Sequence, residues 1–195
     1  MVHLHIPLGL WQRIQSYARA ASPNEVTGIG LMKMADREFL SVTRLFLPKQ
    51  STCAGFCDFA EGELNQIILE VIQEDPKQAK MLCFRWHSHA EGSVFWSGRD
   101  EQDIDAWKGA WVANLVVNVR GDYCARLDIF EPLRLKNIPV EVAIDCPLDP
   151  EIDKVCAQEV HEKLTEIPPT WQLTGQMTGV KKGDGYGLFG SKQHL

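Results

Sequence analysis

The sequence predicts an α/β fold in which a mixed central β-sheet is flanked by helices. Segments with helical periodicity alternate along the chain with short apolar or alternating segments that are typical of strands. The 195 residues are 45% hydrophobic and 24% charged, which is near the average of globular domains. A chain of this length and composition can bury one core, and no internal repeat indicates a solenoid.

The N-terminal part is expected to form a helix and then a β-hairpin. Apolar side chains recur with helical spacing through residues 8–21, and Ser22-Pro23 stops the helix. Residues 26–34 and 38–47 have the composition of strands and flank a short turn. The two strands are therefore expected to pair with each other.

The middle of the chain is expected to form a loop, a helix and a buried strand. Residues 48–60 are rich in Pro, Ser, Thr and Cys, which favours a loop. Helical spacing of apolar residues predicts a helix over 60–75, which Pro76 ends. Residues 81–86 indicate a short buried strand, and 90–96 are expected to be a loop.

The later elements are another helix, three strands and a last helix. A helix is expected over 97–108. Residues 111–119 and 123–130 alternate as a strand pair does, and 138–144 indicate a further strand. A proline introduces the last helix, over 151–164.

The composition divides the chain into three parts. Residues 1–145 form the predicted main domain, 146–169 a C-terminal helical extension, and 170–195 a glycine-rich tail. The run G-D-G-Y-G-L-F-G in the tail follows no strand and opens no helix, which argues against a phosphate-binding loop.

Charge and hydropathy exclude several classes of function. A net charge of -6 and a pI near 5.5 argue against a nucleic-acid binder, for which a basic face is expected. No apolar run approaches the roughly 20 residues that span a bilayer, and the N-terminus lacks the pattern of a secretion signal. We therefore expect a cytoplasmic protein without a membrane partner.

Two histidines, a serine and an aspartate follow the strand predicted at 81–86. His87 and His89 are two residues apart, so on a strand both side chains point to the same face. Ser97 and Asp100 are three residues apart, so on a helix they share a face. Two imidazoles and one carboxylate with a fourth position open are typical of a catalytic zinc site.

The same residues have a second interpretation. Ser97-x-x-Asp100 is also the pattern of a helix capping box, which is compatible with a metal site. Glu91, Glu101 and Asp103 are alternative acidic ligands, but their spacing is poorer than that of Asp100.

Two neighbouring pairs of residues also have two interpretations each. Phe95 and Trp96 either grip a substrate beside the metal or cover the core. Cys53 and Cys57 are either reduced and buried, as is common in a cytoplasmic chain, or ligands of a second metal.

With a glutamate upstream, this pattern resembles the motif of the JAMM (JAB/MPN) zinc metalloprotease family. That motif is a distant glutamate, then H-S-H or H-T-H, seven residues, and S-x-x-D. The resemblance covers residues 1–145, where Ala90 stands in place of the proline that family members commonly have. The residues that form the motif in this chain are Glu25, His87, Ser88, His89, Ser97 and Asp100.

The resemblance implies an MPN/JAB (cytidine-deaminase-like) fold and a role for each site residue. One Zn²⁺ would bind to His87, His89 and Asp100. Glu25 would be the general base for the attacking water, and Ser97 would donate to the oxyanion.

The resemblance also implies the substrate and the partners. The chain would be a compact, prokaryotic-type isopeptidase that cleaves after the C-terminal glycine of ubiquitin or a ubiquitin-like protein. Its partners would be that protein or its conjugates, with activating and conjugating enzymes. Alternatives are a peptidase for a sulfur-carrier adduct or a phage tail protein, and a non-catalytic MPN scaffold.

Overall fold

The computed structural model describes residues 1–35, 38–145 and 150–166. The glycine-rich tail predicted at 170–195 and part of the expected turn at 35–37 lie outside the described residues. The elements are, in order, β1 (Val2–Ile6), α1 (Leu8–Ala21), β2 (Thr27–Met34), β3 (Phe39–Phe46), β4 (Gln50–Cys53), β5 (Phe56–Phe59), α2 (Glu63–Glu74), the short 3₁₀ helix Ala79–Met81, β6 (Phe84–Ser88), α3 (Gly98–Asp105), β7 (Trp111–Val117), β8 (Tyr123–Ile129), β9 (Leu135–Ile144), α4 (Pro150–Lys163) and β10 (Leu164–Glu166).

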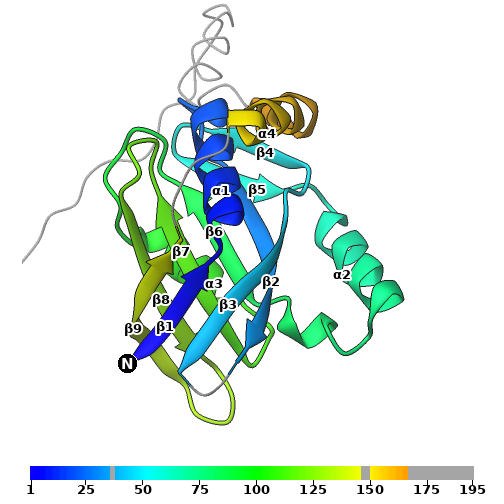
Figure 1. Ribbon diagram of the computed structural model, residues 1–195, viewed down its shortest axis with the longest axis vertical. Helices are drawn as coiled ribbons and strands as arrows, with labels where there is room; N and C mark the ends of the chain where they lie inside the picture. Colours follow the sequence, from blue (N-terminus) through cyan, green and yellow to red (C-terminus); the bar gives the residue numbers. More distant parts are fainter. Residues whose placement is uncertain (36–37, 146–149, 167–195) are drawn as a thin grey trace, which may run out of the picture.

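Seven strands form a closed mixed barrel in the order β1, β3, β2, β6, β7, β8 and β9 (Figure 1). β1 closes the barrel because it pairs in parallel with β3 on one side and with β9 on the other. The prediction of an MPN/JAB α/β fold, with a central sheet flanked by helices, is therefore wrong. β1 was not predicted, although it buries Leu4 and Ile6 completely. Without β1, the strands β3 and β9 would be the two edges of an open sheet.

Most of the predicted elements are confirmed within one to three residues at their ends. The helix predicted over 8–21 is α1, and the expected hairpin is the antiparallel pair of β2 and β3. The pair β7 and β8 is antiparallel as expected, whereas β6 and β7 run in parallel. The strand predicted over 81–86 begins later than expected, because a 3₁₀ turn precedes it.

The prediction of a loop over 48–60 is wrong. These residues contain β4 and β5, which pair with each other and with β10 in a small separate sheet of order β10, β4, β5. α4 packs against α1, and Cys156 and Val160 on α4 are buried in the same apolar cluster as the barrel interior.

The core contains large aromatic side chains under the candidate site. Trp86 on β6 is fully buried and stacks on Tyr17 of α1, with ring centroids 5.8 Å apart. Gly28 on β2 admits this indole, because a Cβ atom there would lie 2.4 Å from Trp86 Nε1. The packing of α1 on the barrel therefore depends on a glycine in the strand next to β6.

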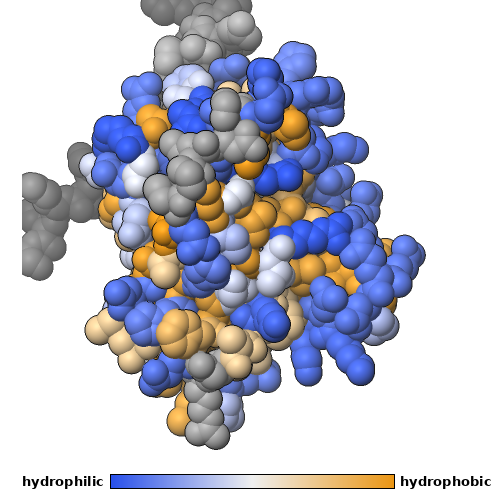
Figure 2. All heavy atoms as spheres, viewed as in Figure 1, coloured by the Kyte–Doolittle hydropathy of each residue, from blue (hydrophilic) through white to orange (hydrophobic). Residues whose placement is uncertain are grey.

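A second apolar cluster joins α2 to the barrel. Ile67 and Val71 of α2 pack against Ile29 and Leu31 of β2. Hydrophobic residues reach the surface along this junction in Figure 2. None of the helices in the described ranges combines the length and the apolar character that a bilayer crossing requires.

Candidate metal centre

The end of β6 directs two histidines to one point. His87 is in β6, and His89 directly follows the strand. Trp86, before His87, and Ser88, between the two histidines, are fully buried. Successive side chains of a strand point to opposite faces, so the two histidines lie on one face and Trp86 and Ser88 lie on the other. The Nε2 atoms of His87 and His89 lie 3.1 Å apart.

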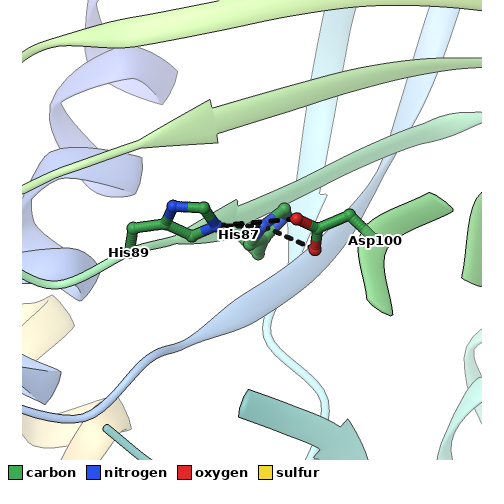
Figure 3. A group of neighbouring side chains, drawn as sticks. All are labelled: His87, His89 and Asp100. Atoms are coloured by element: carbon green, nitrogen blue, oxygen red, sulfur yellow. Dashed lines mark hydrogen bonds and ion pairs between the residues drawn. The ribbon is translucent and has the colours of Figure 1, made fainter. Parts of the chain in front are cut away.

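The start of α3 brings an aspartate to the same point. Ser97 is the N-cap residue, and its Oγ accepts from the backbone N–H of Asp100 at 3.2 Å. Asp100 Oδ2 in turn accepts from the Ser97 N–H at 2.7 Å, which completes a capping box. The capping box of the sequence pattern is therefore confirmed, and the same carboxylate also faces the two histidines (Figure 3).

The spacing of the ligand atoms fits a tetrahedral metal ion. Asp100 Oδ1 lies 3.0 Å from His87 Nε2, and Oδ2 lies 3.6 Å from His89 Nε2. Atoms that coordinate a tetrahedral Zn²⁺ at about 2.0–2.1 Å lie about 3.3 Å from one another. Among the described residues, these three form the group whose donor atoms could hold a metal ion. Cys53 and Cys57 are not part of it, and their thiols are free.

A hydrogen bond fixes the tautomer of one candidate ligand, His89. His89 Nδ1 donates to the backbone carbonyl of Ser93 at 2.9 Å. In the neutral imidazole the proton is then on Nδ1, which leaves the Nε2 lone pair for a metal.

The charges of the three side chains also suit a cation. Burial by itself would raise the pKa of Asp100, but hydrogen bonds with His87 and His89 outweigh it and hold that pKa well below its usual range. Burial lowers the pKa of His87, whereas the hydrogen bond with Asp100 raises the pKa of His89. The carboxylate is therefore ionised at neutral pH, and His87 is the imidazole that loses its proton first.

Glu25 reaches the site because β2 pairs with β6. The N–H and C=O of Val26 bond with Ser88 Oγ at 3.1 Å and with the Ser88 N–H at 2.8 Å. Glu25 precedes this contact and lines a cavity of about 300 Å³ together with His87 and Asp100. Burial raises the pKa of Glu25 to about 7, against a smaller opposing effect of His89. A carboxyl group with this pKa can both accept and donate a proton near neutral pH.

The remaining predicted site residues lie in different surroundings. Ser97 lines the cavity, and its role as N-cap uses an acceptor position of the hydroxyl and leaves the O–H free to donate. Phe95 also lines the cavity and is 55% exposed, with its ring edge on His89. Trp96 instead lies against His87 and over the guanidinium of Arg126.

The loop after His89 contains an unusual backbone conformation. Ala90 has a φ of 44°, a value that a proline ring cannot adopt because it fixes φ near −65°. Ala90 is buried, and its C=O accepts from the Val119 N–H at 2.9 Å. Alanine therefore fits the local backbone at position 90, and proline would not.

Sequence reasoning missed the residues that hold the Glu25 segment. The Glu25 N–H donates to the Cys53 carbonyl at 2.9 Å, and Thr52 Oγ1 donates to the Glu25 carbonyl. The amide of Gln50, which is buried, bonds both the N–H and the C=O of Thr27 at 2.9 Å. No local signal marks these residues, because their role depends on a strand that was expected to be a loop.

A second, mainly apolar groove adjoins the cavity that Glu25, His87 and Asp100 line. It measures about 450 Å³ and extends between α2, β5 and α3. Both cavities are lined by Thr27, Cys57, Arg85 and Asp103, so they lie side by side. The apolar part of the lining consists of Ile29, Phe59, Leu64, Ile68, Leu82 and Trp107.

Comparison with known proteins yields a distant structural likeness. No protein-family model matches the chain, and no curated protein sequence matches it. The solution structure of protein DSY2949 from Desulfitobacterium hafniense, a structural genomics target, is similar with 16% identity and a TM-score of 0.47. The match covers 76% of this chain and 97% of that chain. At this level of similarity the likeness carries no argument about function.

Proposed function

We propose that the chain is a JAMM-like zinc isopeptidase that hydrolyses the amide bond after the C-terminal glycine of a ubiquitin-like protein. The observation that carries the proposal is the convergence of His87, His89 and Asp100 within 4.8 Å, with Glu25 in the same cavity. His87, His89 and Asp100 would hold the ion. When bound, Zn²⁺ would supply a Lewis acid for the scissile carbonyl and lower the pKa of water toward neutrality.

The protein side chains supply the proton transfers and the charge stabilisation. A carboxylate oxygen of Glu25 takes the proton of the attacking water and later delivers it to the leaving amine. The pKa of Glu25, near 7, suits both steps. The free O–H of Ser97 donates to the carbonyl oxygen as it becomes negative, and one such donor is worth about 3 kcal/mol of transition-state energy.

The surroundings of the cavity favour an extended peptide as substrate. In the described part of the chain, β5 pairs with β4 on one side, and no strand pairs with its other side. β5 also contributes Cys57 to both cavities. A substrate strand can add to such an edge through main-chain hydrogen bonds, with an apolar side chain in the adjoining groove and glycine at the scissile bond.

Cleavage of a defined substrate tests the proposal. The full chain would be incubated with a ubiquitin-like protein fused through its C-terminal glycine to a reporter, with and without chelator. We expect the parent to cleave the fusion, a chelator to stop the cleavage and added Zn²⁺ to restore it. E25Q should not cleave the fusion. Zinc binding without cleavage of such fusions would instead favour a non-catalytic scaffold, and cleavage unaffected by E25Q would contradict the mechanism.

A further inference from the structure

Arg126 of β8 is a buried cation beneath the metal centre. Its side chain is 2% exposed, and its Nε donates to Asp128 Oδ2 at 2.9 Å. Asp128 is fully buried and is held by Asn114 Nδ2 and by the Asn137 N–H, both at 2.9 Å. A buried arginine is costly unless its donors are satisfied, so this pair anchors the guanidinium firmly in the barrel.

One arm of this network reaches α3. The Nη1 and Nη2 atoms of Arg126 donate to the two carboxylate oxygens of Glu101, with Nη2 3.0 Å from Oε2. Such a two-point contact fixes direction as well as distance. Glu101 is the neighbour of Asp100, so the contact ties the first turn of α3 to β8 next to the metal ligand.

A second arm reaches His87. The guanidinium carbon of Arg126 lies 4.7 Å from the centroid of the Trp96 ring. The Trp96 ring in turn makes an edge contact with His87, with centroids 6.4 Å apart. Arg126 therefore supports both the helix that carries Asp100 and the indole that rests on His87.

We infer that Arg126, acting through Glu101, is a positioning residue that holds Asp100 at binding distance from His87 and His89. This inference rests on the metal site of the proposed function. The distances between donor atoms in the site are 3.0 and 3.6 Å, and a rotation of α3 would change both. Loss of a group that orients metal ligands commonly lowers metal affinity 10- to 100-fold.

An exposed ion pair at the other end of α3 provides a matched control. Arg134 donates to Asp105 at 2.5 Å, and Lys136 contacts both Asp105 and Glu101. R134Q removes an ion-pair partner of α3 at the end of the helix away from Asp100. E101Q removes the anionic partner of Arg126 at the end of the helix that carries Asp100. Both substitutions remove one charge, keep a polar side chain and leave Lys136 in place.

Zinc affinity of the full chain and of its variants tests the inference. Competition with a chromophoric chelator would give the zinc Kd, and thermal unfolding of the zinc-free proteins would give the cost in stability. We expect E101Q to weaken zinc binding about 10-fold and R134Q by less than twofold. E101Q should also melt at a lower temperature than R134Q, because one N–H of the buried Arg126 loses its acceptor. R126K keeps the charge but not the two-point contact, and we expect an intermediate loss of affinity.

The outcomes separate this inference from the proposed function. E101Q that binds zinc as tightly as the parent overturns the positioning role alone, whether or not R126K folds. Equal losses of affinity in E101Q and R134Q also overturn it, because the effect would then be general loosening of α3. A parent chain that binds no zinc overturns the proposed function and this inference with it.

Discussion

Replacing Glu25 by Gln should stabilise the zinc-free protein at high pH, although it removes the proposed catalytic base. The pKa of Glu25 is raised from 4.5 to about 7, chiefly by burial, so the folded protein binds this proton more tightly than the unfolded chain. Stability contributed by the protonated form is present below pH 4.5 and is lost as the pH rises toward 7. Above pH 7 the ionised carboxylate is a net cost to folding.

The size of this cost follows from the shift. Each pKa unit corresponds to about 1.4 kcal/mol, which gives about 3 kcal/mol for a group without solvent contact. Glu25 is only partly buried, so water screens the charge and about 1–2 kcal/mol remains. For a domain of this size that change moves the melting temperature by about 4 °C.

Thermal unfolding of the protein in the presence of a metal chelator, between pH 4.5 and pH 8.5, measures this change in stability. We expect E25Q to melt about 4 °C above the parent at pH 8 and at the same temperature at pH 4.5. E91Q is the control, at an exposed glutamate in the loop after His89. Its melting temperature should change between pH 4.5 and pH 8 by the same amount as that of the parent. A melting temperature of E25Q below that of the parent at pH 8 would refute the reasoning. So would a difference in melting temperature between the two proteins that does not change with pH.

Three further changes have definite expected outcomes. S97A should lower kcat about 10²-fold, because it removes the proposed oxyanion donor, and should lower stability by about 1 kcal/mol, because it removes the N-cap. S97T should restore both, and full activity of S97A would exclude the donor role. Zinc affinity should fall as the pH drops from 8 to 5.5, because protons compete for the imidazoles and the pKa of His89 is raised. A flat affinity profile in chelator competition over this range would contradict His87 and His89 as ligands. A90P should lower stability in urea unfolding by more than 1 kcal/mol, because proline cannot adopt a φ of 44°; an unchanged midpoint would mean that the loop relaxes.

The local elements could be predicted from the sequence, but the closure of the barrel could not. α1 and α2 have clear helical periodicity, and β7 and β8 alternate, so their identity depends only on neighbouring residues. Closure depends on β1, a five-residue segment that pairs with strands far away in the sequence. The segments β4 and β5 have mixed polar composition and lack alternation, so they resemble a loop until β10 and β2 are placed beside them.

The candidate site shows the same division between local and distant information. The two-residue spacing of His87 and His89 places both on one face of a strand, and Asp100 lies in the first turn of the helix that follows. The three residues are close in sequence, so the local pattern was enough to predict that they meet. The place of Glu25 depends on the pairing of β2 with β6. Arg126 was missed for a similar reason, because an arginine in an alternating strand gives no sign that it will be buried under a helix.

The zinc content of two variants tests the central claim most directly. D100N removes the proposed carboxylate ligand but can keep the capping hydrogen bond to Ser97. D103N changes an acidic residue of the same cavity that lies outside the proposed ligand group. Elemental analysis of the full chain after dialysis against limited Zn²⁺ would count bound ions. We predict one Zn²⁺ per chain in the parent and in D103N, and almost none in D100N. D100N that retains the zinc content of the parent would contradict the assignment of the site.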